Sequence, residues 1–258
     1  MKNLHGRCLA IALLSTFFQG VTVWAEPVPV TITSLDPRFD QLLPKDAKLE
    51  KLADGFSWVE GPVWNKQGGY LLFSEIPTNS VYKWKPDEGV SLFVKNSGYR
   101  GTIPFAGKEP GSNGLTLDAQ GRLILCQHGD RQIGRLESNG MIVPLVSHYD
   151  GYKFNSPNDL VFTSNGDLYF TDPPFGLPKV FDDPSKAPVQ GVYRLSNDGT
   201  VTLLIDDIKA QKGIAFSPDE KTLYVSDVDL ERAAWLAYDV KEEGLVMNSR
   251  VLFDATRW

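Results

Sequence analysis

The sequence predicts an all-β fold, a β-propeller of which about four blades are present. A unit of two apolar strands joined by a tight turn occurs four times, and helical periodicity is scarce along the 258 residues. Equivalent positions of the four copies are Glu60, Asn113, Asn158 and Lys212, at offsets of 53, 45 and 54 residues. Offsets of this size are typical of repeats that each form one small sheet. We call these four positions the ring residues.

The clearest copy of the unit covers residues 155–176. Asn158 precedes an apolar segment, Asn165 and Gly166 mark a turn, and a second apolar segment ends at Asp172. In the other copies the corresponding strand pairs are 60–64 with 71–75, 113–117 with 123–127, and 212–216 with 223–227. Because the sheets of a propeller are arranged radially, we expect the ring residues to converge around the central channel.

The remaining segments are consistent with this arrangement. Residues 191–195 and 201–205 alternate as outer strands of a hairpin. The turn-rich stretch 35–46 leads into 47–53, which we predict to be a strand that completes the last blade of a closed propeller. Residues 177–188 form a proline-broken loop that either shapes a binding mouth or is a neutral insertion.

Residues 1–25 have the features of an export signal. Lys2 and Arg7 precede a short apolar run, and a small-residue cleavage site ends at Ala25. The run is too short to span a membrane, although a transmembrane anchor is the alternative interpretation. We therefore expect a periplasmic or secreted protein, in which residues 26–258 are one propeller domain with no membrane attachment.

Composition excludes several kinds of partner and site. The formal net charge is −6, or −8 without Lys2 and Arg7, and an acidic chain without a basic cluster is a poor nucleic-acid binder. Cys126 is the only cysteine after the signal, so no intramolecular disulfide forms. His128 and His148 alone cannot make a three-histidine zinc site. The chain has no G-x-S-x-G elbow, no P-loop and no G-x-G-x-x-G motif.

Glu60 is the most informative carboxylate for function. It lies between Trp58 and Trp64 in an apolar segment, where an unpaired charge is costly to bury. Together with Asn158 it offers hard oxygen ligands and no thiolate or imidazole, a donor set that suits calcium and disfavours zinc. A salt bridge between Glu60 and a nearby Lys or Arg is the alternative.

Asn113 and His128 are candidate substrate-binding residues. Asn113 precedes Gly114, and Asn-Gly is a turn dipeptide regardless of function, but its ring position favours a role in the site. Asn158 likewise allows an Asx-turn. His128 ends an inner strand, where it either faces the pocket as a donor or proton carrier or is a hydrogen-bonded structural histidine.

Five motifs taken together resemble the gluconolactonase and senescence-marker-protein (regucalcin) family. They are WVEGPVW at 58–64, SNGLTLD at 112–118, NSPND at 155–159, FTDPPFG at 170–176 and IAFSPDEKTLY at 214–224. The resemblance runs from about Leu35 to the last residue. It implies a six-bladed propeller that holds one catalytic divalent ion at the channel mouth, usually calcium, with zinc, magnesium or manganese as the other choices.

The resemblance also implies an activity and roles for single residues. The family hydrolyses sugar lactones such as glucono-1,5-lactone, with the ion acting on the lactone carbonyl and a carboxylate activating water. Glu60 is similar to the first metal ligand of the family, and Asn158 to the ligand from the third blade. Asn113 and His128 lie where contacts with the sugar lactone are expected.

The chain departs from the family pattern in two places. Where the family has Asn before Gly in the fourth blade, this chain has Lys212, whose ammonium would repel a divalent ion. The fifth-blade Asp that serves the family as ligand and base is expected beyond Trp258, so the catalytic base is unknown from the sequence. Two blades are expected beyond the chain as well. The sheet edges left open by the missing blades favour oligomers. Four explanations of the missing blades stay open: the chain is a fragment of a longer product, it is a truncated allele, a partner chain supplies the missing edge, or the four blades close as a ring.

Three hypotheses for function follow. The first is calcium-dependent hydrolysis of sugar lactones. The second is a non-catalytic propeller that binds a ligand, in which Lys212 replaces the ion by its own charge against Glu60. The third is a degenerate remnant that does not fold stably.

Overall fold

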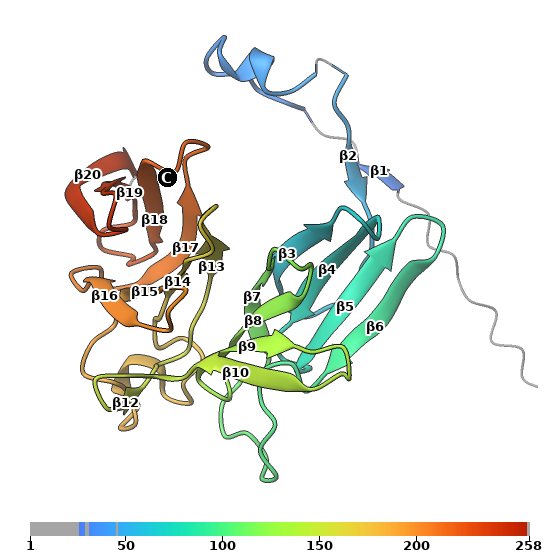
Figure 1. Ribbon diagram of the computed structural model, residues 1–258. Coiled ribbons are helices and arrows are strands. Elements are labelled where there is room, and N and C mark those ends of the chain that lie inside the picture. Colours follow the sequence, from blue (N-terminus) through green and yellow to red (C-terminus); the bar gives the residue numbers. More distant parts are fainter. Residues whose placement is uncertain (1–25, 29–30, 45, 257–258) are drawn as a thin grey trace, which may run out of the picture.

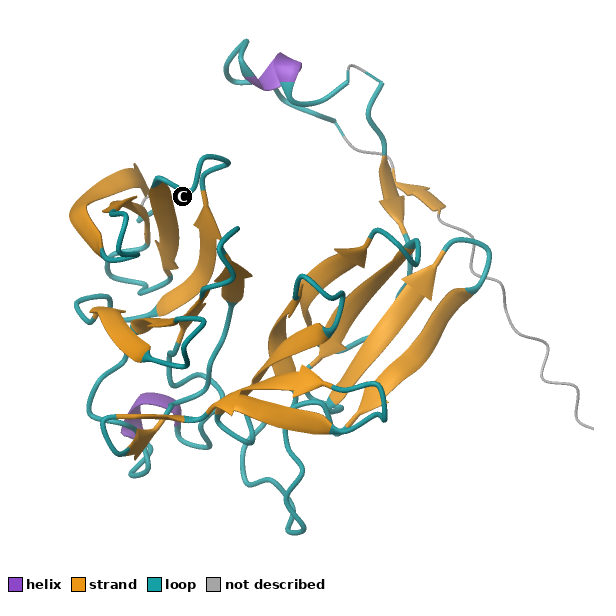
Figure 2. Cartoon of the chain, in the orientation of Figure 1, coloured by secondary structure: helices purple, strands orange, loops and turns teal. Residues whose placement is uncertain are grey.

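A computed structural model describes residues 26–28, 31–44 and 46–256, and it confirms the all-β fold (Figure 1 and Figure 2). The predicted export signal, residues 1–25, lies outside the described residues. The helices of the described part are two short 3-10 turns, η1 (Phe39–Gln41) and η2 (Val180–Asp182). None of them is long and apolar enough to cross a membrane.

Four antiparallel sheets of four strands each form the body of the described chain, and each contains one predicted repeat (Figure 1). We call them blades one to four. Blade one consists of β3 (Val59–Asn65), β4 (Tyr70–Glu75), β5 (Ser80–Lys85) and β6 (Gly89–Lys95), and blade two of β7 (Ser112–Leu117), β8 (Leu123–Gln127), β9 (Gln132–Leu136) and β10 (Ile142–Val146). Blade three consists of β13 (Leu160–Phe162), β14 (Leu168–Thr171), β15 (Val192–Leu195) and β16 (Val201–Ile205), and blade four of β17 (Gln211–Phe216), β18 (Thr222–Asp227), β19 (Ala234–Val240) and β20 (Val246–Asp254). Strands pair in chain order, so each blade is a meander whose first strand begins next to a ring residue.

Apolar side chains fill the interfaces between successive blades. One cluster joins each pair of neighbouring blades, and in chain order the three clusters include Leu72 with Leu125, Ile124 with Phe170, and Tyr169 with Val225. Neighbouring residues of a strand point to opposite faces of the sheet. Ile124 and Leu125 of β8 therefore serve two different interfaces, which explains why the inner strands are continuous apolar runs.

The inner strands approach each other closely at glycines that follow ring residues. Gly61 has φ +57, and a Cβ atom there would lie 2.2 Å from the carbonyl oxygen of Asn113. At Gly114 a Cβ atom would lie 2.7 Å from the carbonyl oxygen of Asn158, which accepts a hydrogen bond from the Gly114 amide at 2.7 Å. Only glycine fits such approaches. Backbone contact thus brings successive ring residues together.

The N-terminal segment differs from the expectation. β2 (Leu49–Lys51) forms within the predicted strand 47–53, but it pairs with β1 (Glu26–Val28) in a separate two-stranded sheet. Blade four is built from four consecutive strands, and the β1–β2 hairpin lies away from β20 (Figure 1). A second small hairpin joins blades two and three through β11 (His148–Tyr149) and β12 (Tyr152–Lys153).

The outward faces of blades one and four are apolar and exposed. Trp64 on β3 is 48% exposed, and Trp235 on β19 is 54% exposed and packs on Phe253 at a ring-centroid distance of 5.3 Å. No described strand of blade one pairs with a strand of blade four. Exposed apolar faces of this kind are typical of contact surfaces. Association through these faces stays a prediction.

Asp172, at the end of the first strand pair of blade three, is fully buried. Its Oδ2 accepts hydrogen bonds from the backbone amide of Asn155 at 2.7 Å and from the Asn155 side-chain amide at 3.1 Å. Burial nevertheless dominates and raises the pKa of the Asp172 carboxyl to about 7.

This buried carboxyl predicts a pH dependence of stability. Between about pH 4 and pH 7 the folded chain keeps a proton that the unfolded chain has released, so the free energy of unfolding falls as the pH rises through that interval, by at most ~4 kcal/mol. Asp172→Asn removes this titration, and thermal melts at pH 5 and pH 8 should differ less than for wild type. The exposed Asp40→Asn variant is the control. Equal pH dependence of wild type and Asp172→Asn would contradict the prediction.

Candidate active site

The four ring residues meet at one place, as the repeat spacing predicted. They line two adjacent cavities, of about 250 Å³ and about 360 Å³, and all four are shared between them. We call these the first and second ring cavities. The first is walled further by Trp58, Glu109, Phe175, Val180 and Val228, and the second by backbone and side chains of the inner strands.

Lys212 and Glu60 form an ion pair across the ring. The Lys212 ammonium lies 2.8 Å from Oε1 of Glu60, and the Trp58 indole N–H donates to the same oxygen at 3.3 Å. The Lys212 and Glu60 side chains are 34% and 26% exposed, so we expect the pair to contribute only about 1 kcal/mol to stability. The salt bridge considered for Glu60 therefore exists, and its cation comes from the fourth blade.

The backbone around Lys212 is held by blade three. The Thr171 hydroxyl donates to the Lys212 carbonyl at 2.7 Å and accepts from the Asp159 amide at 3.1 Å. The Asp159 carboxylate accepts from the backbone amide of Ile214 at 3.0 Å. Burial raises the pKa of the Asp159 carboxyl above its ordinary value. These contacts fix the start of β17, from which the Lys212 side chain reaches Glu60.

Asn113 and Asn158 are nearly buried, at 5% and 2% exposure. The carbonyl of Asn113 accepts from the Ser74 hydroxyl at 2.8 Å, and Ser74 also contacts the hydroxyl of Ser112 at 2.8 Å. The backbone amide of Asn158 donates to the backbone carbonyl of Thr171 at 2.9 Å. Both asparagines thus have fixed backbones, and both line the two ring cavities.

The donor set does not fit a divalent ion in this arrangement. Calcium takes roughly six to eight oxygen ligands, several of them carboxylates. Glu60 is already paired with the Lys212 ammonium, and the Asp159 carboxylate is bonded to backbone amides of Leu160 and Ile214. In the part of the chain that the structure describes, no cluster of three or more His, Cys, Asp or Glu side chains is suited to a metal.

His128 lies behind the cavity wall. It is fully buried after β8, and its Nδ1 lies 3.2 Å from Oε2 of Glu109, which lines the first ring cavity. Sequence reasoning missed Glu109, because it belongs to the irregular loop before β7 and has no counterpart in the other repeats. Its only signal is its position four residues before Asn113.

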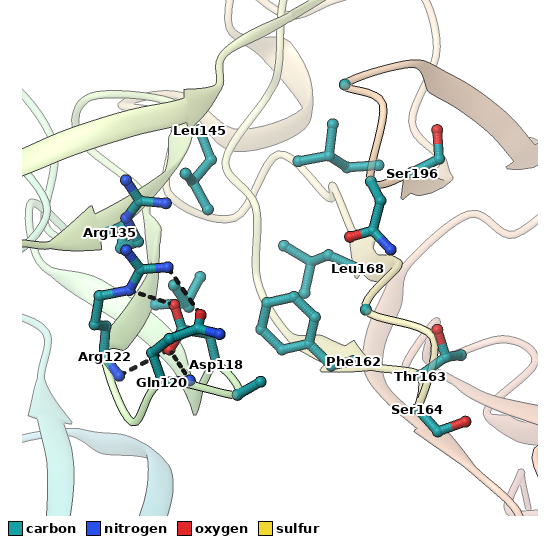
Figure 3. Close-up of a pocket in the computed structure, with 16 residues that line it drawn as sticks. Asp118, Gln120, Arg122, Arg135, Leu145, Phe162, Thr163, Ser164, Leu168 and Ser196 are labelled. Atoms are coloured by element: carbon teal, nitrogen blue, oxygen red, sulfur yellow. Dashed lines mark hydrogen bonds and ion pairs between the residues drawn. The ribbon is translucent and has the colours of Figure 1, made fainter.

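A larger cavity lies between blades two and three at the other ends of their inner strands. It has a volume of about 440 Å³, and Figure 3 shows Arg122 beside Asp118 and Gln120 on its wall. Arg122 donates to the Asp118 carboxylate at 2.7 Å and to Gln120 at 3.0 Å. The Arg122 guanidinium is thus paired with residues of its own turn between β7 and β8. No ring residue lines this cavity. The ring cavities are therefore the candidate site.

Comparison with known proteins identifies the family. Residues 58–257 match the SMP-30/Gluconolactonase/LRE-like region. The chain belongs to this family. It is 40% identical over 224 residues to the gluconolactonase of Zymomonas mobilis subsp. mobilis, and 31% identical over 199 residues to the lactonase drp35 of Staphylococcus aureus. Its fold matches the gluconolactonase of Xanthomonas campestris with a TM-score of 0.74 at 32% identity, over 89% of this chain and 73% of that chain.

The match to the family's curated members is partial in length. It covers 86% of this chain but 63% of the Zymomonas protein, and 74% of this chain but 53% of the Staphylococcus protein. The chain thus spans less than two thirds of the length of these relatives. The recognition of the gluconolactonase family from five motifs is nevertheless confirmed, as is a propeller fold of the kind that family members have.

The position of Lys212 depends on Thr171. Thr171→Val removes the hydroxyl that bonds the Lys212 carbonyl and leaves that carbonyl without its donor, so we expect a loss of about 1–3 kcal/mol in the free energy of unfolding. Urea unfolding followed by fluorescence measures it. The exposed Thr102→Val variant is the control and should change little. If Thr171→Val unfolds with the same free energy as wild type, the hydrogen bond from Thr171 to the Lys212 carbonyl does not hold β17.

Proposed function

We propose that the chain carries a lactone-hydrolysing site of the gluconolactonase type at the two ring cavities. The observation that carries the proposal is the convergence of the four ring residues, with the Lys212 ammonium held at Glu60. Membership of the family, and the gluconolactonases among its relatives, support it. Sugar lactones such as glucono-1,5-lactone are the proposed substrates.

A lactone is a cyclic ester whose opening is accelerated when the charge that develops on its carbonyl oxygen is stabilised. A lysine ammonium has three N–H donors, and the pair with Glu60 uses one of them. In the proposed complex the others face the carbonyl oxygen. The side-chain amides of Asn113 and Asn158 form hydrogen bonds with the sugar hydroxyls. Trp58 and Phe175 supply the apolar part of the cavity wall.

The calcium dependence that the sequence predicted is untested, and it carries a structural condition. An ion can use Glu60 and Asn158 only if the Lys212 side chain leaves the Glu60 carboxylate, since a cation already lies there. We propose that Lys212 supplies the positive charge of the site. The six-bladed ring and the periplasmic or secreted location likewise stay predictions.

A non-catalytic binding site is the second candidate function. The ion pair favours it, because Lys212 neutralises Glu60 without any cofactor and leaves the amides of Asn113 and Asn158 to bind hydroxyl groups. Such a site binds a sugar or its lactone without opening it. Binding without turnover distinguishes this candidate from the hydrolase.

A pH-stat assay with glucono-1,5-lactone tests the hydrolase. We expect turnover above the spontaneous rate, and no loss of rate in excess chelator, because Lys212 supplies the charge. Lys212→Met should lower the rate by about 100-fold or more. Lys209→Met, which removes an exposed lysine three residues away, is the matched control. Complete loss of activity in chelator would contradict the role of Lys212, and lactone binding without turnover would favour the second candidate.

Calcium titration tests the ion pair itself. Lys212→Asn replaces the ammonium by an amide oxygen, which can bind an ion. We expect calorimetry to give a calcium affinity at least about tenfold above that of wild type, a difference in binding free energy of about 1.4 kcal/mol. Lys209→Asn should behave as wild type does. Tight calcium binding by wild type would mean that the Lys212–Glu60 pair opens readily.

A further inference from the structure

Glu109 is the second carboxylate on the wall of the first ring cavity, and its chemistry differs from that of Glu60. Glu60 is paired with the Lys212 ammonium, whereas Glu109 is backed by a histidine. The Glu109 side chain is 21% exposed, and the His128 side chain is 0% exposed. A carboxylate that reaches the cavity and rests on a buried imidazole is suited to exchanging protons with a bound molecule.

The backbone on both sides of this contact is fixed. Pro110 follows Glu109 and restricts the loop, and the Gly111 amide donates to the Ile76 carbonyl at 3.1 Å. The His128 amide donates to the Gly111 carbonyl at 3.2 Å. The end of β8 and the loop before β7 are thus joined within two residues of Glu109, so its carboxylate is placed by the scaffold.

The imidazole also packs closely against the loop after Asp172. A Cβ atom at Gly176 would lie 2.5 Å from the His128 ring, so only glycine leaves room for it. The preceding residue, Phe175, lines the same cavity as Glu109. The loop after Asp172 therefore covers His128 and keeps it from the cavity, which leaves Glu109 as the group of this pair that a substrate meets.

We propose that Glu109 is the general base of this site and that His128 is its positioning residue, an inference that rests on the proposed lactone hydrolysis. Glu109 accepts a proton from water as the water oxygen bonds to the lactone carbonyl carbon. The bond between that carbon and the ring oxygen then breaks, and Glu109 returns the proton to the departing ring oxygen. Water and lactone thus give the open hydroxy acid with no further reactant.

The other charged groups on this wall support the assignment. Lys212 and Glu60 neutralise each other in part, and Asn113 and Asn158 do not titrate in the working range. The base function therefore falls to Glu109, with Lys212 available to the carbonyl oxygen. The His128 imidazole lies directly behind this carboxylate, with its Nδ1 3.2 Å from Oε2 of Glu109.

Glu109→Gln keeps the shape of the side chain and removes the base, and it tests the proposal in the full chain with glucono-1,5-lactone. We expect kcat to fall by about 100-fold or more while KM changes by less than about threefold. Glu109→Asp keeps the carboxylate, so it should retain more activity than Glu109→Gln. Glu231→Gln, at a side chain that is 86% exposed and away from the cavity, is the matched control. Thermal melts show that each variant is folded.

His128→Gln gives a readout that a merely structural role would not change. Loss of the imidazole should lower kcat by about tenfold or more while KM changes by less than about threefold, because the Glu109 carboxylate loses the side chain that lies behind it. An active wild type with Glu109→Gln within about threefold of it would overturn this inference alone. No turnover by wild type would overturn the proposed hydrolysis together with it.

Discussion

The close approach of the inner strands is the constraint on which the site depends. Gly61 and Gly114 leave no room for a Cβ atom, and the Gly114 amide bonds the Asn158 carbonyl of the next blade. This backbone contact sets the spacing between neighbouring blades at their inner edge. Ring residues that are about fifty positions apart in the sequence therefore face one another, and interblade clusters such as Leu72 with Leu125 hold the blades in that relation.

The repeat pattern predicted the fold and the ring because both follow from local spacing. Each polar ring residue stands next to an apolar run, and alternation along that run assigns its side chains to two interfaces. The pairing of β2 with β1 could not be predicted in this way, because an isolated alternating segment does not specify its partner. Glu109 was missed for a related reason: it lies in a loop whose path is set by contacts to Ile76 and His128 rather than by any repeat.

The interpretation of His128 shows how burial decides between two roles that a sequence leaves open. The position at a strand end agreed with either a pocket donor or a structural histidine. In the structure the ring is fully buried beneath Gly176 and meets Glu109, so its influence on the cavity passes through a carboxylate. Lys212 shows the opposite case. Its departure from the family pattern was evident in the sequence, and one hypothesis already set its charge against Glu60. The structure places the Lys212 ammonium 2.8 Å from that carboxylate.

We infer that the Lys212 ammonium takes the position beside Glu60 that a divalent ion would otherwise need. A crystal structure grown in calcium at near-neutral pH tests this most directly. We expect the Lys212 ammonium within about 3 Å of Glu60 and no ion bound to that carboxylate. A calcium ion bound to both Glu60 and Asn158, with Lys212 turned away, would contradict it.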